Sequence, residues 1–380
     1  MAHRLETAAL QSLIEVLQQR SYTVLGPTPR DGAIVYDVLS SSADLPKGYT
    51  DEQSPGHYRL HSNGDATCFA FTVGPQSWKK FLFPPTIRLF SAFRNGKTVT
   101  LPGNGMNETG VPVKKLAFFG VRSCELHAIG IQDKVFIGPS YQDPHYRRLR
   151  EQLFVVAVNC SRPSDTCFCT SMATGPKATG GFDIALTEVA DASGIFYLAE
   201  GGTKLGEDVL MSVEHRPAGT EDLAKAESVL NSAAASMQKM LDTTDIKELL
   251  YQNHEHPEWE KVAARCLTCT NCTMVCPTCF CHTIDDATDL VGSEGIRNRR
   301  WDSCFTLDFS YIHGGSVRIS SKARYRQWMT HKLAAWIDQF GTSGCVGCGR
   351  CITWCPVAID ITEEARIIRE GSASEPEQMT

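Results

Sequence analysis

The first two hundred residues alternate between helical and strand-like spacing of apolar side chains. Over residues 5–19 the apolar positions recur at helical intervals, which predicts an amphipathic helix. The positions on its apolar face are Leu5, Ala8, Leu13, Ile14 and Leu17. Residues 34–38 and 68–73 show the short apolar patterns of strands. The chain is therefore predicted to begin with an α/β arrangement.

Two uninterrupted apolar runs predict strands that are buried on both faces. They are KLAFFGV at residues 115–121 and LFVVAV at residues 153–158. The first run leads into Cys124 and a segment of helical periodicity, and the second ends near Cys160. Further strand candidates lie at residues 182–186 and 195–198. Two cysteines are thus expected just beyond the ends of buried strands.

The pattern changes near residue 220. Residues 221–255 are largely helical in pattern and predict a connector, after which cysteines cluster over residues 256–370 around a helical segment at 325–340. The polar tail, residues 371–380, has the composition of a disordered segment. The predicted fold is therefore a mixed α/β (α+β) domain over residues 1–220, followed by a mostly helical, ferredoxin-like domain with a long insertion.

Composition narrows the classes of function. The 380 residues carry a formal net charge of −6 with both signs interspersed, so no basic face for nucleic acid is expected. The N-terminus lacks the apolar core of a secretory signal, and no apolar run reaches the roughly 20 residues that span a bilayer. We therefore expect a cytoplasmic protein without a membrane or nucleic-acid partner. In a reducing compartment, its 16 cysteines favour metal binding over disulfides.

Eight of the cysteines form two copies of the motif CxxCxxCxxxCP. The first copy is Cys266, Cys269, Cys272 and Cys276, and the second is Cys345, Cys348, Cys351 and Cys355. This spacing is typical of two-cluster ferredoxins, in which three cysteines bind one 4Fe-4S cluster and the fourth, expected to open a helix, binds the neighbouring cluster. The predicted ligand sets are therefore crossed. One is Cys266, Cys269, Cys272 and Cys355, and the other is Cys345, Cys348, Cys351 and Cys276.

Two other kinds of site share part of this pattern. Zinc sites also use four thiolates, although their motifs usually come as two CxxC pairs separated by a long loop, and such a site would indicate a binding module. Cys272, Cys276 and Cys279 spell CxxxCxxC, the triad of radical S-adenosylmethionine enzymes, but here the triad lies inside a longer run with a matching partner downstream. Two clusters in a protein of eight irons remain the favoured interpretation.

The insertion between the motifs, residues 277–344, contributes three further cysteines. Cys279, Cys281 and Cys304 are interpreted either as buried structural thiols or as neighbours of a cluster that tune its potential. The aromatic segment 301–315 could be a docking surface, but buried packing is the favoured role for its Trp301 and Phe305. Cys68 lies in an apolar segment and is interpreted as a core thiol.

A third metal site is a hypothesis for the first domain. Cys124, Cys160, Cys167 and Cys169 all follow the ends of the two buried strands. Loops beyond the carboxyl ends of neighbouring strands in an open α/β sheet converge at one crevice, so these thiols could meet there. Their spacing matches no standard cluster motif, however, and a structural role is the open alternative.

The chain shows no nucleotide-binding motif. The segment GNGMNETG at residues 103–110 lacks the spacing of a dinucleotide fingerprint and is interpreted as a turn. No flavin or nicotinamide site is therefore expected within the chain itself. Such chemistry is expected to belong to a partner.

Several segments together resemble a known family. They are GVRSCELHAIG, NCSRPSDTCFCTSMATGP, CLTCTNCTMVCPTCFCH, RRWDSCFTLDFSYIHGG and SGCVGCGRCITWCPVAIDIT. They resemble the β subunit of cytoplasmic NAD(P)-linked nickel-iron hydrogenases, also called sulfhydrogenases, over roughly residues 115–365, and the A subunit of anaerobic sulfite reductase is similar. The first hundred residues add little to the likeness.

The resemblance implies an electron-relay subunit without catalytic residues. It implies that nickel-iron large and small subunits belong to the same complex, together with a flavin-containing, NAD(P)H-linked partner subunit. The eight ferredoxin cysteines carry over position by position, whereas the resemblance does not settle the ligands of a third cluster. The A subunit of a sulfite reductase and, from another class, a radical S-adenosylmethionine enzyme are the alternative functions.

Overall fold

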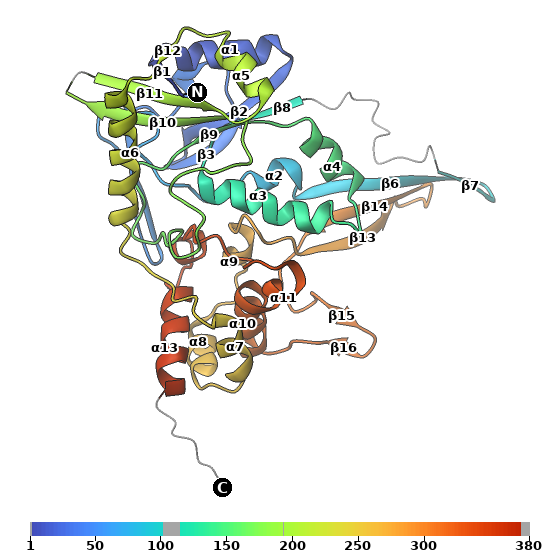
Figure 1. Cartoon of the computed structure of the whole chain (residues 1–380). Helices are drawn as coiled ribbons and strands as arrows, with labels where there is room; N and C mark the ends of the chain where they lie inside the picture. Colours follow the sequence, from blue (N-terminus) through green and yellow to red (C-terminus); the bar gives the residue numbers. More distant parts are fainter. Residues whose placement is uncertain (1, 102–114, 193, 374–380) are drawn as a thin grey trace.

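Eight strands form the central sheet of the chain (Figure 1). The structure is a computed structural model and describes residues 2–101, 115–192 and 194–373. In spatial order the strands are β12 (Arg216–Pro217), β1 (Ala2–Glu6), β11 (Gly194–Gly201), β10 (Ile184–Asp191), β9 (Phe154–Val158), β8 (Lys115–Val121), β2 (Tyr22–Arg30) and β3 (Ala33–Val38). The predicted α/β character of this part of the chain is confirmed.

The middle of the sheet is parallel, which explains its apolar sequences. β2 pairs with β8, β8 with β9, and β9 with β10 in parallel, whereas the outer strands run antiparallel. All five residues of β9 are buried, as expected for a strand covered on both faces. Because β8 and β9 are parallel neighbours, the segments that leave them begin at the same edge of the sheet.

Helices cover both faces of this sheet (Figure 1). On one face lie α1 (Ala9–Gln19) and α5 (Lys204–Leu210), and on the other lie α2 (Lys79–Leu82), α3 (Ser123–Phe136) and α4 (Pro144–Glu151). Val156 belongs to the same hydrophobic core as Leu13 and Leu17 of α1, whereas Val155 belongs to the core that contains Phe136 of α3. Consecutive residues of β9 therefore contribute to opposite cores.

Two predictions at the start of the chain need correction. The predicted helix at 5–19 begins only at Ala9, because Leu5 belongs to β1, which pairs with β11. The segment 68–73 is not a strand: the backbone N–H groups of Cys68 and Phe69 donate to the Glu188 carboxylate at 2.7 and 2.9 Å. Side chains thus take the backbone groups that a strand would offer to a neighbour. Cys68 itself is buried in the core, as predicted.

Between these elements lie two short features of the first domain. The 3-10 turn Ser42–Asp44 follows β3, and β4 (Tyr49–Ser54) and β5 (His57–Ser62) form a separate hairpin. The predicted connector contains α6 (Thr220–Ala235) and α7 (Ile246–Gln252). The division of the chain into domains at these positions stays a prediction.

The C-terminal part has a core of its own built from short helices. They are α8 (Glu258–Arg265), α9 (Asn271–Met274), α10 (Ser321–Thr330), a π-helical turn (His331–Ala335), α11 (Trp336–Phe340), α12 (Arg350–Thr353) and α13 (Ile361–Ala373). The predicted helix at 325–340 is confirmed. The predicted tail begins too early, because residues 371–373 still belong to α13; residues 374–380 and the turn predicted at 103–110 lie outside the described residues.

The insertion departs from the predicted mostly helical domain. It contains β13 (His282–Thr288) and β14 (Glu294–Trp301), which pair with each other, and the small hairpin of β15 (Tyr311–Ile312) and β16 (Gly315–Ser316). Strand β14 also pairs with β6 (Thr86–Asn95) of the first domain, which pairs in turn with β7 (Thr98–Thr100). The expected alternation in β13 and β14 is obscured by charged residues, because Arg297 and Arg300 pair across the strands with Asp286 and Asp285.

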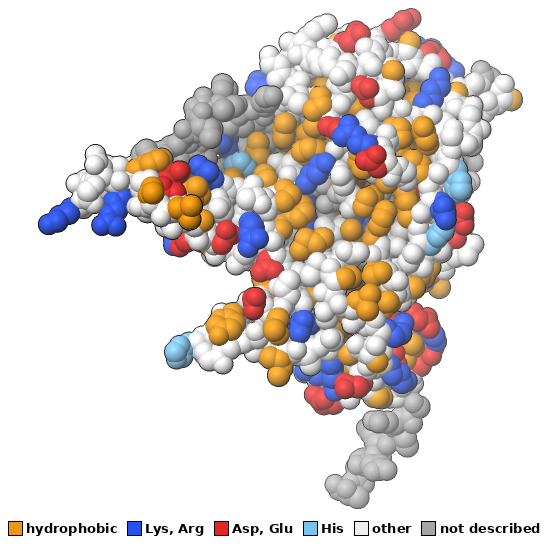
Figure 2. Space-filling model, turned by 180° about the vertical axis from the view of Figure 1, so that it is seen from behind, with side chains coloured by type: hydrophobic (Ala, Val, Ile, Leu, Met, Phe, Trp, Pro, Cys, Tyr) orange, Lys and Arg blue, Asp and Glu red, His pale blue; other side chains and the backbone are white. Residues whose placement is uncertain are grey.

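Both sets of strands project from the body of the molecule and carry apolar side chains (Figure 2). In the predicted docking segment, Tyr311 and Ile312 are exposed, whereas Phe305 is buried and the Trp301 indole donates to the Phe83 carbonyl at 2.9 Å. The packing role of Trp301 and Phe305 is confirmed, and docking stays a prediction. Among the described residues, no helix combines the length and apolar character needed to cross a membrane.

A buried ion pair joins the first domain to the second cysteine motif. The Arg350 guanidinium of α12 donates to the Glu125 carboxylate of α3 at 2.6 Å, and both side chains are at most 1% exposed. The Tyr36 hydroxyl and the Trp78 indole also donate to Glu125, at 2.7 and 3.0 Å. One carboxylate therefore accepts hydrogen bonds from three separate segments of the chain.

Removal of the Glu125 charge should destabilise the fold strongly. In Glu125→Gln the Arg350 guanidinium stays buried without an anion, so we expect the free energy of unfolding to fall by about 3–5 kcal/mol. Urea unfolding followed by tryptophan fluorescence measures the change. The control Glu151→Gln removes an exposed partner of Arg147 and should change stability by less than about 0.5 kcal/mol. Equal unfolding midpoints for the two variants would contradict this role.

Candidate iron-sulfur centres

The first crossed set of cysteines lines one cavity. Cys266, Cys269 and Cys272 come from the loop between α8 and α9, and Cys355 reaches the same cavity from the second motif. Burial raises the pKa of Cys272, and the neighbouring thiols raise it further. The backbone N–H of Thr268 points to Cys266 Sγ at 3.4 Å, and that of Ile359 points to Cys355 Sγ at 3.3 Å. Such N–H groups stabilise thiolate ligands of iron-sulfur clusters.

The four thiols of the second crossed set lie close enough to influence one another electrostatically. Burial raises the pKa of Cys345 to about 12, and the nearby thiols of Cys348 and Cys276 contribute to this rise. Burial also raises the pKa of Cys351, and the thiols of Cys345, Cys348 and Cys276 contribute to this rise, as does Cys272 of the first set. The arrangement agrees with the crossed ligand sets, although metal ligation by these eight residues stays a prediction.

The two motifs share one backbone turn but differ in the residues that form it. Thr268 and Thr270 of the first motif have φ of 50° and 71°, and Gly347 and Gly349 at the equivalent positions have φ of 64° and 73°. A Cβ at Gly347 would lie 2.6 Å from the Phe168 carbonyl oxygen, and one at Gly349 would meet Thr166 equally closely. Glycine is therefore required only in the second motif, where the loop that carries Cys167 and Cys169 packs against it.

The fourth cysteine of each motif does not open a helix, which corrects the prediction. Cys276 comes two residues after the end of α9, and Cys355 comes two residues after the end of α12. Each is followed by proline, which disfavours helical backbone at the preceding residue. The third cysteine, Cys272 or Cys351, is the one that lies on a short helix.

The four cysteines of the hypothetical third site also line one cavity. Cys124 lies at the start of α3, directly after β8, and Cys160 follows β9, so both reach the cavity from the shared edge of the parallel strands. Cys167 and Cys169 reach it from the loop that follows. Cys348 of the second set lines the same cavity. The structure thus brings these thiols together, and metal binding there stays a prediction.

A buried guanidinium lies beside this third set. Arg122 is 3% exposed and donates to the carbonyl oxygens of Phe69 and Phe71 at 2.7 and 3.0 Å, while its Nε has no hydrogen-bond partner among the residues that the structure describes. Arg122 also lines the cavity. Two buried carboxylates, those of Glu188 and Asp51, lie within electrostatic reach of this guanidinium, and the positive charge at the edge of the cavity is compatible with an anionic cluster that has thiolate ligands.

Hydrogen bonds hold the loop of the third set against the second motif. The Phe168 N–H donates to the Gly347 carbonyl at 2.8 Å, and the Thr174 hydroxyl donates to the Val346 carbonyl at 2.7 Å. The third and second sets are therefore fixed neighbours.

The remaining thiols of the insertion lie beside Cys276. The Cys279 thiol lowers the pKa of Cys276, and the Cys304 thiol lowers the pKa of Cys281, so the members of each pair lie close together. Two buried lysines, Lys79 and Lys332, lie among these thiols. Sequence reasoning missed both lysines, because nothing in their local pattern distinguishes them from exposed ones. Their placement supports the interpretation of these cysteines as neighbours of a cluster.

None of the three cysteine sets has the geometry of a site for a single metal ion in the described part of the chain. Within the ranges that the structure describes, no three His, Cys, Asp or Glu side chains are grouped closely enough to hold one metal ion. The thiols of the first and third sets instead surround cavities.

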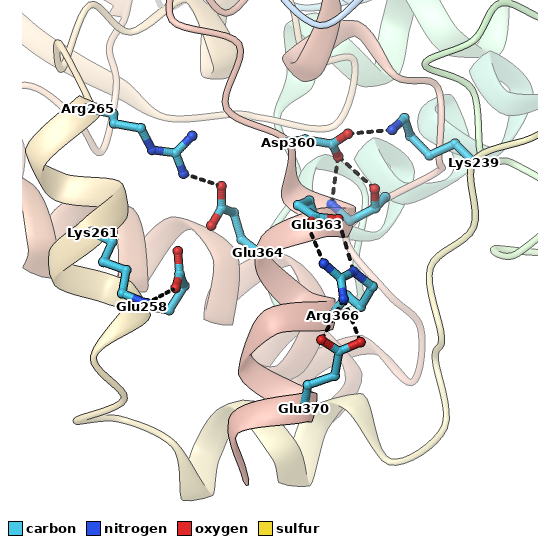
Figure 3. Close-up of polar contacts among 10 residues, drawn as sticks. Lys239, Glu258, Lys261, Arg265, Asp360, Glu363, Glu364, Arg366 and Glu370 are labelled. Carbon is cyan, nitrogen blue, oxygen red and sulfur yellow. Dashed lines mark hydrogen bonds and ion pairs between the residues drawn. The ribbon is translucent and has the colours of Figure 1, made fainter. Parts of the chain in front are cut away.

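Ion pairs connect helix α13 to the residue before Cys266 and to Lys239 (Figure 3). Arg265, the residue before Cys266, donates to the buried Glu364 carboxylate of α13 at 2.6 Å, and Lys239 pairs with Asp360 at the start of that helix at 2.5 Å. Burial raises the pKa of Glu364 from 4.5 to about 7, and the neighbouring Glu258 contributes to the rise. Helix α13 is thereby fixed to the first motif.

Stability should depend on the pH through Glu364. Because folding raises the pKa of this carboxyl, the native state holds the proton more tightly than the unfolded chain does. The native state should therefore lose stability as the pH rises from 4.5 towards 7. Thermal unfolding of Glu364→Gln should show a smaller loss over the upper part of this window than the unchanged protein. An identical pH dependence in Glu364→Gln would contradict the assignment, with Glu363→Gln on the exposed face as the control.

Comparisons with known proteins agree with this geometry. A family model described as a 4Fe-4S dicluster domain matches residues 265–359, which include both motifs and the insertion. Sulfhydrogenase 2 subunit beta from Pyrococcus furiosus is 33% identical over 296 residues, covering 77% of this chain and 83% of that protein. No solved structure matches the chain. Because the likeness extends over most of both proteins, the chain belongs to the family of sulfhydrogenase beta subunits and carries a 4Fe-4S dicluster domain.

Proposed function

We propose that this chain is the electron-transfer subunit of a multi-subunit, cytoplasmic nickel-iron hydrogenase. Its position would be between the nickel-iron large and small subunits on one side and a flavin-containing, NAD(P)H-linked subunit on the other. It would have no flavin or nicotinamide site of its own. The observation that carries the proposal is the arrangement of three sets of four cysteines in a row. When bound, 4Fe-4S clusters supply one-electron transfer, and their potentials depend on burial and on hydrogen bonds to sulfur.

The order of the three sets supports a relay. Cys348 of the second set lines the cavity of the third set, and Cys351 of the second set lines the cavity of the first. The second set is therefore the middle one. We infer two clusters in the dicluster domain and a third cluster at Cys124, Cys160, Cys167 and Cys169.

The first set lies at the surface, as expected for the terminal cluster of a relay. Cys269 is exposed, and the adjacent Leu267 is 60% exposed, so this set reaches the surface of the chain. Behind it, Phe305, Tyr325 and Trp328 line the cavity and exclude water. A partner that covers Cys269 would exchange electrons over a short distance. No side chain is required here as an acid, base or nucleophile.

The structure gives no support to a radical S-adenosylmethionine enzyme. Such a protein would need Cys272, Cys276 and Cys279 around one cluster, whereas Cys272 lines the first cavity and Cys276 gathers with Cys345 and Cys348. The name of the relative also favours a hydrogenase over a sulfite reductase as the parent complex.

The test uses the complete complex purified anaerobically with its partner subunits. In Cys355→Ser, which removes a ligand of the first set, hydrogen-dependent reduction of NAD(P)+ should fall at least a hundredfold. Oxidation of hydrogen with a viologen dye should be retained, because the dye takes electrons directly from the catalytic subunits. The control Cys68→Ser, a core thiol outside the three sets, should retain both activities.

Undiminished NAD(P)+ reduction in Cys355→Ser would contradict a relay through the first set. A complex that oxidises NAD(P)H with sulfite but does not oxidise hydrogen would contradict the hydrogenase assignment and support the sulfite reductase alternative.

A further inference from the structure

Lys332 places a buried positive charge directly on a predicted cluster ligand. Its Nζ donates to Cys276 Sγ at 3.1 Å and to the Thr278 hydroxyl oxygen at 3.0 Å, and the residue is 5% exposed. The Thr278 hydroxyl in turn donates to the Gly344 carbonyl at 2.7 Å. The ammonium group therefore lies between the fourth cysteine of the first motif and the start of the second motif.

No carboxylate balances this charge within the described part of the chain. The acidic side chains that influence Lys332 most are the thiols of Cys276, Cys279 and Cys345, and a cysteine becomes a thiolate when it binds a cluster. A second buried lysine nearby, Lys79, donates to the Cys279 carbonyl at 3.1 Å and lies 4.0 Å from the centre of the Trp301 ring. Buried ammonium groups are costly unless an anion compensates them, and the only candidates for that anion among these contacts are the sulfur ligands.

The position of Lys332 is fixed by the backbone. The residue lies in the π-helical turn His331–Ala335, between α10 and α11, a kind of irregularity that is frequent at functional sites. Its carbonyl accepts hydrogen bonds from the Gly344 N–H at 2.7 Å and from the Ser343 hydroxyl at 3.2 Å. The helix that carries the charge is thus attached to the loop that precedes Cys345.

Among the described residues, the first set has no positive charge in an equivalent position. The cavity of Cys266, Cys269, Cys272 and Cys355 is lined by apolar and uncharged polar side chains, without a lysine or arginine. Arg324 makes only a minor contribution that lowers the pKa of Cys266, and its guanidinium donates hydrogen bonds to three backbone carbonyls. The two sets of the dicluster domain therefore differ in charge although their motifs are the same.

We propose that Lys332 sets the reduction potential of the second cluster, bound by Cys345, Cys348, Cys351 and Cys276, above that of the first. Reduction adds one negative charge to a cluster, and a fixed positive charge in hydrogen-bond contact with a ligand stabilises the reduced form. Lys332 acts through Cys276 and is a positioning residue. The proposal rests on the proposed function, because it requires clusters at both sets.

The test is a potentiometric titration of the full-length chain followed by EPR, for the unchanged protein, Lys332→Met, Lys332→Gln and Lys332→Arg. In Lys332→Met and Lys332→Gln the second cluster should become harder to reduce. At a fixed potential its ratio of reduced to oxidised form should fall about tenfold, which corresponds to a reduction potential about 59 mV lower. The other clusters should titrate as before. Lys332→Arg keeps the charge and should stay close to the unchanged protein.

Lys322→Met is the matched control, because Lys322 lies on α10 and pairs with Glu255 and Glu260 away from the cysteines. It should change no potential. Unchanged potentials in both neutral variants, with all clusters present by iron content, would overturn the proposal for Lys332. If Lys332→Met fails to assemble, Lys332→Gln, which retains a hydrogen-bond donor, decides. Absence of clusters from the unchanged protein would instead overturn the proposed function.

Discussion

The ion pair between Arg350 and Glu125 is the interaction on which the arrangement of the cysteine sets depends. Arg350 lies between Cys348 and Cys351 of the second motif, and Glu125 is next to Cys124 of the third set. Neither charge has access to water, so each needs the other, and the pair fixes the distance between two sets of thiols. Two parts of the chain that are far apart in sequence are thereby held as one unit.

Close packing around this pair explains why the two ferredoxin motifs are not interchangeable. Gly347 and Gly349 allow the loop of the third set to touch the second motif, whereas threonines suffice at the equivalent positions of the first. The same asymmetry extends to charge, because buried lysines lie beside the second set, whereas no lysine of the described ranges lines the first cavity. Unequal surroundings of this kind would give clusters at the different sets unequal reduction potentials.

Some features of the fold and of the cysteine sets could be predicted from local sequence, whereas those that depend on distant contacts could not. The cysteine spacing and the apolar runs of β8 and β9 act locally, so the motifs and the shared edge of the sheet could be predicted. The segment 68–73 could not, because its backbone is satisfied by Glu188, more than a hundred residues away. The hairpin of β13 and β14 was missed because charged residues obscure its alternation, and the pairing of β14 with β6 was missed because β6 lies far earlier in the chain, near residue 90. The roles of Lys332 and Arg122 could not be predicted, because the neighbouring sequence does not show that these side chains are buried.

The central claim, that three sets of cysteines hold three 4Fe-4S clusters, is tested most directly by the iron and acid-labile sulfide content of the full-length chain, purified anaerobically. At four irons per cubane, the account predicts about twelve irons per chain, and about eight in a variant with both Cys160→Ser and Cys169→Ser. The control Cys68→Ser should retain about twelve. About eight irons in the unchanged protein would show that the first domain binds no cluster and would contradict the account.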